Sequence, residues 1–192
     1  MNRNLSLLRM TAAALLIAVG IVIPMVSPVK IVIEPMSFTL ASHVAIFIAM
    51  FISPMAGIAV AAGTTLGFFI AGFPLVVVLR AASHLIFTTL GALYLKARPQ
   101  TLGSVGASQC FSLVVGLIHA AAEVAVVFLF YFYHADQTVA QNFMTVRVLL
   151  GLVGLGTIVH SMVDFAIAYI VYQALIRQRN LRRLFLTPPE TA

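Results

Sequence analysis

Long apolar runs fill most of this chain and leave little room for anything but membrane-spanning helices. Hydrophobic residues make up 62% of its 192 residues, and charged residues only 8%. A helix needs about 20 apolar residues to cross the hydrocarbon core of a bilayer. We therefore expect an all-α membrane protein with about six spans, multi-pass in the cell membrane, and no soluble domain of any size.

Short polar or proline-containing segments separate the runs and set the boundaries of a single transmembrane domain, residues 1–192. The predicted spans cover residues 7–26, 40–52, 55–71, 75–95, 105–131 and 146–176, and a basic tail follows at 177–192. Between the first two spans, the stretch Val29–Ile33 is rich in β-branched residues. This favours a short extended or hairpin segment over a helix, so we expect a structured loop there.

The cations indicate the orientation of the chain in the membrane. With six spans, eight of the eleven lysines and arginines fall on the side that both termini share, namely Arg3, Arg9, Lys96, Arg98, Arg177, Arg179, Arg182 and Arg183. Loops rich in Lys and Arg stay in the cytoplasm, so we expect cytoplasmic termini and an outer loop between the first two spans. No basic domain or recognition motif indicates nucleic-acid binding.

Ionisable side chains inside the spans are the candidate functional residues, because such groups are costly within a bilayer. Three pairs occur at i,i+4 spacing, which places both members on one helix face: Arg80/His84, His119/Glu123 and His160/Asp164. Polar stripes on three consecutive spans predict a shared polar cavity. Asp164 is expected deeper, in the inner half of its span, where it would bond another helix or a partner subunit.

Two further candidates are expected near the outer ends of spans. His43 follows Ser37, Thr39 and Ser42 in the sequence, and together they predict the rim of an outer-face site. Arg147 either extends to the lipid headgroups or helps to attract an anion.

Arg80 has two interpretations that the sequence leaves open. It either only balances the charge of Glu123, or its planar guanidinium binds a carboxylate or phosphate of a substrate.

Several motifs of enzymes are absent. The sequence holds no Walker A motif, no His-Glu-x-x-His and no Gly-x-Ser-x-Gly, so we expect no ATP hydrolysis by this chain, no enzymatic activity, no cofactor and no metal. Histidine and carboxylate can bind zinc or iron, so an intramembrane metalloenzyme stays an alternative, although the spacing fits no known motif. A second alternative is a stand-alone proton-coupled transporter that uses His119, Glu123, His160 and Asp164 as a proton relay. A third alternative is a purely structural membrane protein.

Longer stretches of the sequence resemble a known family. Ala14 and Ala18 have the small-xxx-small spacing that allows close helix contact. Together with the stretches Val29–His43, Ile46–Pro54 and Gly72–His84, they resemble the substrate-binding S components of energy-coupling factor (ECF) vitamin transporters, above all the niacin-type group. The resemblance covers nearly the whole chain.

The resemblance implies a substrate, partners and a mechanism. An S component binds a vitamin near the outer face and topples against a transmembrane coupling subunit, driven by two ATPase subunits. The implied partner surface is Ala14 and Ala18, and the implied lid is the loop 27–39. The implied substrate-binding residues are Arg80, His84, His119, Glu123, His43, Arg147 and His160.

For nicotinate in particular, Arg80 would bind the carboxylate, while His84, His119 or a nearby aromatic side chain would contact the ring. If Glu123 neutralises Arg80 completely, a neutral vitamin is implied instead.

Overall fold

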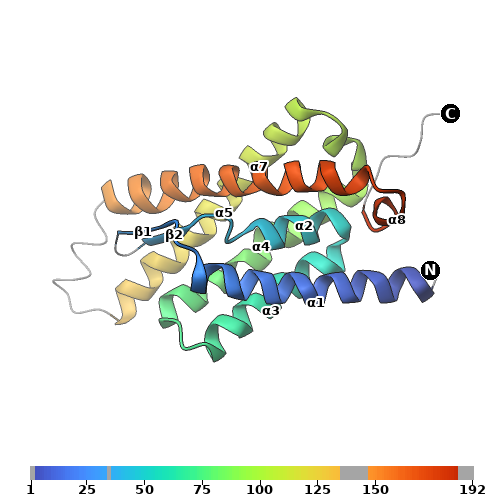
Figure 1. Ribbon diagram of the computed structural model, residues 1–192. Helices are drawn as coiled ribbons and strands as arrows, with labels where there is room; N and C mark the ends of the chain where they lie inside the picture. Colours follow the sequence, from blue (N-terminus) through green and yellow to red (C-terminus); the bar gives the residue numbers. More distant parts are fainter. Residues whose placement is uncertain (1–2, 34–35, 135–146, 186–192) are drawn as a thin grey trace.

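The computed structural model describes residues 3–33, 36–134 and 147–185 (Figure 1), and the part it describes is almost entirely helical. The main helices are α1 Arg3–Val26, α2 Val44–Ile52, α3 Pro54–Ile70, α4 Leu75–Ala97, α5 Val105–His134 and α7 Gly156–Ile176. A short 3₁₀ turn, η1 Pro99–Gly103, precedes α5, and a π-helical segment, η2 Arg147–Leu155, leads into α7. The small helix α8, Arg179–Arg182, follows α7.

The described helices match the composition of a membrane protein. Four of them are long and apolar enough to cross a bilayer: Asn4–Val26, Leu75–Ala97, Val105–Tyr133 and Val148–Ile176. Helix α3 is apolar but shorter. The prediction of an all-α membrane protein is therefore confirmed, while the number of crossings stays a prediction.

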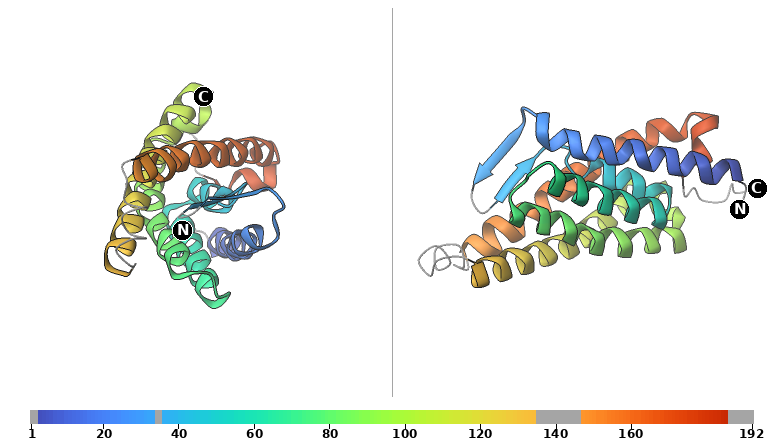
Figure 2. Two further views of the ribbon diagram at one scale, coloured as in Figure 1. Left: turned by 90° about the vertical axis from the view of Figure 1, so that its left-hand side faces the viewer. Right: turned by 90° about the horizontal axis from the view of Figure 1, so that it is seen from below.

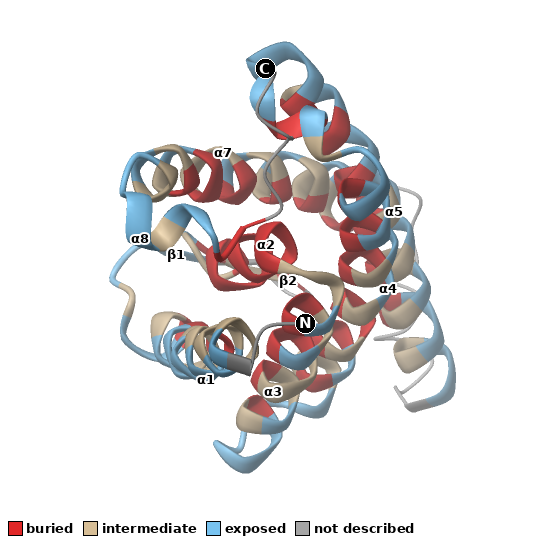
Figure 3. Cartoon of the chain, turned by 90° about the vertical axis from the view of Figure 1, so that its right-hand side faces the viewer, coloured by how far each residue is buried: buried red, intermediate tan, exposed pale blue. Residues whose placement is uncertain are grey.

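Helix α2 forms the centre of the molecule. All nine of its residues are buried, and it contacts α1, α3, α4 and α7, which surround it (Figure 3). A helix that is apolar on every side belongs inside a protein rather than on its surface. At about 1.5 Å per residue, α2 is roughly 14 Å long. This is about half the thickness of a bilayer core, so the helix does not reach both ends of the bundle and its first residue lies inside the protein.

A two-stranded hairpin connects α1 to α2. Strands β1 Lys30–Ile33 and β2 Met36–Thr39 pair antiparallel, with Lys30 opposite Thr39. The extended segment predicted from Val29–Ile33 is confirmed. Figure 2 shows the hairpin at one end of the bundle, while the start of α1 lies at the other end.

The chain then turns sharply into α2 through residues 40–43. Ala41 has a φ of 68°, a left-handed conformation that is unfavourable for any residue with a Cβ atom.

Helices α1 and α3 approach closely because glycines leave room for branched side chains. Ile17 and Ile21 of α1 pack over Gly63 and Gly67 of α3, and Gly20 of α1 lies against Thr64 of α3. Small residues at helix contacts allow this approach in lipid. Ala14 and Ala18 take no part in it, because both lie exposed on another face of α1.

Gly63→Ala should destabilise the protein, because a Cβ at this position would meet three atoms of Ile17, the nearest at 2.6 Å. Overpacking of this kind costs about 1–3 kcal/mol. Gly116→Ala is the matched control, since a Cβ there would lie 3.7 Å from its nearest neighbour. The thermal midpoint in detergent, measured by loss of the size-exclusion peak, should fall for Gly63→Ala alone. Equal midpoints would contradict this account of the contact between α1 and α3.

Candidate functional site

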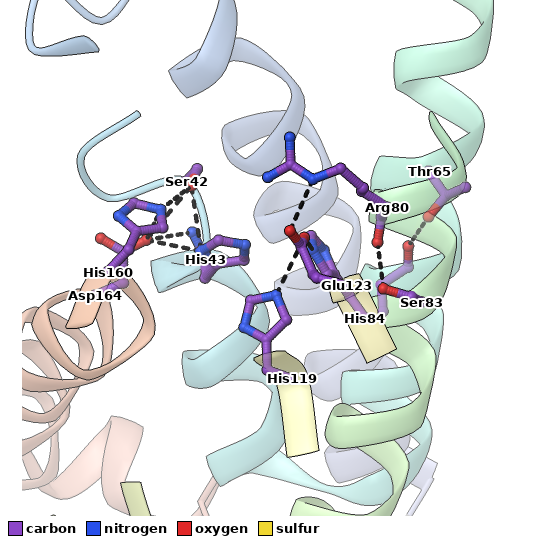
Figure 4. Close-up of polar contacts among 11 residues, drawn as sticks. Ser42, His43, Thr65, Arg80, Ser83, His84, His119, Glu123, His160 and Asp164 are labelled. Carbon is purple, nitrogen blue, oxygen red and sulfur yellow. Dashed lines mark hydrogen bonds and ion pairs between the residues drawn. The ribbon is translucent and has the colours of Figure 1, made fainter. Parts of the chain in front are cut away.

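The three i,i+4 pairs converge on the N-terminus of α2 (Figure 4). Helix α4 contributes Arg80 and His84, helix α5 contributes His119 and Glu123, and helix α7 contributes His160 and Asp164. His43 lies at the N-cap of α2, between these helices. The shared polar cluster that the spacing predicts is therefore present, with one more member from α2.

Glu123 is the centre of one half of the cluster. Its Oε2 accepts a hydrogen bond of 2.7 Å from Nε of Arg80, and its Oε1 lies 3.3 Å from Nε2 of His84 and 3.4 Å from Nε2 of His119. The carboxylate is only 2% exposed. A buried charge of this kind needs a partner of opposite sign and further hydrogen bonds, and Arg80 with His84 supplies them.

Asp164 is the centre of the other half. Its Oδ1 accepts from the backbone N–H of Ala41 at 2.8 Å, and its Oδ2 accepts from the backbone N–H of His43 at 2.9 Å. Oδ2 also lies 3.0 Å from Nδ1 of His43 and 3.5 Å from Nε2 of His160. Asp164 thus fixes the turn that leads into α2, including the left-handed Ala41.

His43 joins the two halves. Its ring meets the rings of His84, His119 and His160 edge to face, with centroids 4.7, 4.8 and 5.0 Å apart. The hydroxyl of Ser42 completes the junction, at 3.1 Å from Nε2 of His160 and 3.3 Å from Nδ1 of His43. A continuous series of polar groups therefore connects α4, α5, α2 and α7.

Three of the sequence expectations need correction or lie outside the described residues. His43 is not at a rim but is buried, at 7% exposure, because the short helix α2 begins deep in the protein. Asp164 is not set apart from the other candidates but belongs to the same cluster. Arg147 begins η2, and its side chain lies outside the described residues.

A small cavity opens beside the cluster. Its polar lining comes from Arg80, His84 and Glu123 together with His43, Ser42, Ser37, Thr39, Thr64 and Lys30, and its apolar lining includes Phe68 and Phe73. The two phenyl rings are stacked at 4.7 Å. Lys30 was not among the residues selected from the sequence, because a lone lysine in a hairpin gives no pattern.

Arg80 keeps part of its hydrogen-bonding capacity. Among the described residues, only its Nε has a hydrogen-bond partner, and the rest of the guanidinium points away from Glu123 and His119 (Figure 4). Since Arg80 lines the cavity, both interpretations from the sequence hold at once. The side chain pairs with Glu123 and still presents donors to the cavity.

Comparison with known proteins identifies a curated transporter as a relative of this chain. No family model matches the chain, and no solved structure matches it. The niacin transporter NiaX of Lactococcus lactis subsp. cremoris (strain MG1363) is 44% identical over 159 residues, which cover 81% of this chain and 69% of that protein.

Asp164→Asn should destabilise the protein, because the amide cannot accept all the N–H groups that the carboxylate accepts, and a buried unpaired donor costs about 1–3 kcal/mol. Ser161→Ala, one turn away in α7, is the control, since its buried hydroxyl has no partner among the described residues. The thermal midpoint in detergent should fall only for Asp164→Asn. An unchanged midpoint in Asp164→Asn would show that Asp164 does not hold the turn before α2.

Proposed function

This chain belongs to the family of niacin transporters, and we propose that it is the substrate-binding S component of an ECF importer for nicotinate. The observation that carries this proposal is the 44% identity to the niacin transporter of Lactococcus lactis across most of both chains. That relative is named as a transporter of niacin. The cavity beside the histidine cluster is the proposed binding site.

The charges of the cavity support an anionic substrate. Its lining holds two cations, Lys30 and Arg80, and one carboxylate, Glu123. One positive charge is therefore left for a ligand, and nicotinate carries one carboxylate. A guanidinium presents paired donors that fit a carboxylate, so we assign Arg80 as the main carboxylate partner and Lys30 as a second cation. This lining argues against the complete neutralisation that would favour a neutral vitamin.

The apolar part of the lining supports an aromatic ligand. Phe68 and Phe73 line the cavity together with the rings of His43 and His84. Aromatic side chains favour offset-stacked or edge-to-face contact with a further ring. We propose that the pyridine ring of nicotinate lies among these four side chains, with its carboxylate toward Arg80.

The hairpin is the proposed lid. Lys30 on β1 and Ser37 and Thr39 on β2 all line the cavity. The cavity holds only about 60 Å³, which is room for about two waters. A pyridine ring therefore needs the hairpin to move outward on entry, and Lys30 would move with it.

The arrangement of the ends supports an even number of crossings with cytoplasmic termini. The start of α1 and helix α8 lie at the same end of the bundle, opposite the hairpin (Figure 1). Nε of Arg9 donates to the carbonyl of Leu184 at 3.0 Å, and Arg9 and Lys96 line one shared groove. The cations thus gather at this end, as they do on the cytoplasmic side of membrane proteins. We propose six crossings, with the lid on the outer side.

The outward face of α1 is the proposed contact with the coupling subunit. Ala14 and Ala18 are exposed there and leave a shallow strip against which another helix can lie closely. Toppling of the chain against that subunit, driven by two ATPase subunits, would carry the bound vitamin across the membrane.

A proton-coupled transporter that works alone is the second candidate. The series Glu123, His119, His43 and Asp164 links two buried carboxylates through imidazole rings, an arrangement that can pass protons. Uptake of nicotinate into liposomes that contain only this protein, driven by a proton gradient, would favour this candidate over the ECF proposal.

Arg80→Gln should weaken nicotinate binding while changing nicotinamide binding little. Hydrogen bonds to charged groups contribute about 1.5–3 kcal/mol, which corresponds to roughly a 10- to 150-fold rise in Kd. Titration of the detergent-purified protein, followed by calorimetry, measures both ligands. Arg98→Gln, exposed at the other end of α4, is the control and should bind like the unchanged protein.

The double variant Arg80→Gln/Glu123→Gln removes both charges together, so no unpaired carboxylate is left inside the protein. It should also lose nicotinate. Full-strength nicotinate binding by either Arg80 variant would overturn the carboxylate assignment.

Ala14→Leu/Ala18→Leu should leave nicotinate binding intact and abolish ATP-driven uptake, because the added side chains keep the coupling subunit away from α1. Ala121→Leu/Ala125→Leu is the matched control, since these alanines have the same spacing and are exposed on α5. Uptake of labelled nicotinate in cells that express the coupling and ATPase subunits measures the difference. Equal uptake by both double variants would refute the proposed contact surface.

A further inference from the structure

His119 is a buried side chain with few polar contacts. Its side chain is 0% exposed, and among the described residues Nδ1 has no polar partner and Nε2 makes no hydrogen bond of good geometry. Its nearest charged neighbour is Oε1 of Glu123, at 3.4 Å from Nε2. Buried polar groups in proteins nearly always have partners, so an imidazole in this state indicates a ligand that the protein alone does not supply.

Three imidazoles converge at this point. His43, His84 and His119 each offer one ring nitrogen, and these nitrogens lie within 4.8 Å of one another. A tetrahedral zinc ion, with Zn–N bonds of about 2.0–2.1 Å, holds its nitrogens roughly 3.3 Å apart. The nitrogens would have to come closer by up to about 1.5 Å to hold such an ion, through rotation of the rings about their side-chain bonds.

The carboxylates around these rings resemble the outer shell of metal sites. One nitrogen of His43 is held by Asp164 at 3.0 Å, and one nitrogen of His84 is held by Glu123 at 3.3 Å. A histidine that binds a metal usually has its other nitrogen bonded to such a group, which fixes the orientation of the ring.

The charge of the cluster also favours a cation. Its two carboxylates, Glu123 and Asp164, are accompanied by one permanent cation, Arg80. The guanidinium of Arg80 points away from His119 (Figure 4). Lys30 of the cavity lining is not in contact with these carboxylates in any hydrogen bond or ion pair of the described residues, so the groups that directly surround the three imidazoles carry more negative than positive charge.

A second group of possible ligands, His43, His160 and Asp164, is less suitable. Asp164 already accepts from two backbone N–H groups and from His43, and Nε2 of His160 already contacts the hydroxyl of Ser42.

We propose that His43, His84 and His119 bind a divalent transition-metal ion such as Zn²⁺ at the floor of the cavity. This departs from the sequence expectation of no metal, which rested on the absence of a known ligand spacing. Three imidazoles suit zinc and its late first-row neighbours. His43 and His84 also line the cavity, which gives the ion a path of entry. The site does not depend on the identity of the transported vitamin.

Titration of the full-length, detergent-purified protein with Co²⁺, without a polyhistidine tag and without nicotinate, tests the proposal. Visible d–d absorption should grow to saturation at one ion per chain, and Zn²⁺ should abolish it. His119→Ala should raise the Kd for Zn²⁺ by at least about 10- to 100-fold, the loss typical of disturbed metal sites. His160→Ala is the matched control and should retain binding.

X-ray absorption of the Zn²⁺-loaded unchanged protein gives a second readout that needs no variant. Three imidazoles in the first shell are expected. The proposal would be overturned if the protein did not bind Co²⁺, or if fewer than three imidazoles surrounded the bound Zn²⁺. It would also be overturned if His160→Ala lost Zn²⁺ binding while His119→Ala retained it. Because nicotinate is absent throughout, these results are independent of whether the cavity binds that vitamin.

Discussion

Two carboxylates lie inside this membrane protein where no bulk water can solvate them, and the arrangement of the helices follows from that constraint. Glu123 and Asp164 are 2% and 0% exposed. Each needs donors from other elements, so Glu123 ties α5 to α4 through Arg80, and Asp164 ties α7 to the turn before α2. His43 lies between the two carboxylates because that turn is anchored by Asp164.

The same anchoring connects the hairpin, our proposed lid, to the core. Strand β2 ends at Thr39, and Ala41 and His43, whose backbone N–H groups bind Asp164, follow directly. Movement of the hairpin therefore pulls on the left-handed residue Ala41 and on a turn held by α7. We therefore expect an opening of the hairpin to shift α7 and α2, while the α1–α3 contact, built from glycines and isoleucines, stays fixed.

The sequence predicted the members of the site better than their depth. The i,i+4 spacing identified Arg80, His84, His119, Glu123 and His160, because a helix repeats its faces every three to four residues whatever surrounds it. Depth was estimated by counting residues along straight spans from their ends. That count failed for His43, because α2 begins at Val44 inside the protein. Asp164 is buried and bonds another helix, as expected, but its partner is His43 at the start of α2.

The sequence also did not predict which partners the side chains of the site contact. The sequence could not show whether Arg80 pairs with Glu123 or faces a cavity. The answer depends on which guanidinium nitrogen contacts the carboxylate, and the spacing of residues along a helix does not determine the direction of a side chain. The place of Lys30 in the cavity lining arises only when the hairpin folds over the helices. The β-branched stretch Val29–Ile33, by contrast, predicted the hairpin correctly, because strand preference there is local.

The central claim is that a carboxylate ligand meets the free side of the Arg80 guanidinium while Glu123 occupies its Nε. Solid-state NMR on membranes that contain the ¹⁵N-arginine-labelled protein and nicotinate labelled with ¹³C at its carboxyl group measures this contact directly. The account predicts dipolar coupling between that carbon and the terminal nitrogens of one arginine, at about 4 Å or less, as hydrogen bonding of a carboxylate to a guanidinium requires. Bound nicotinate whose carboxyl carbon shows no coupling to any arginine nitrogen would contradict it.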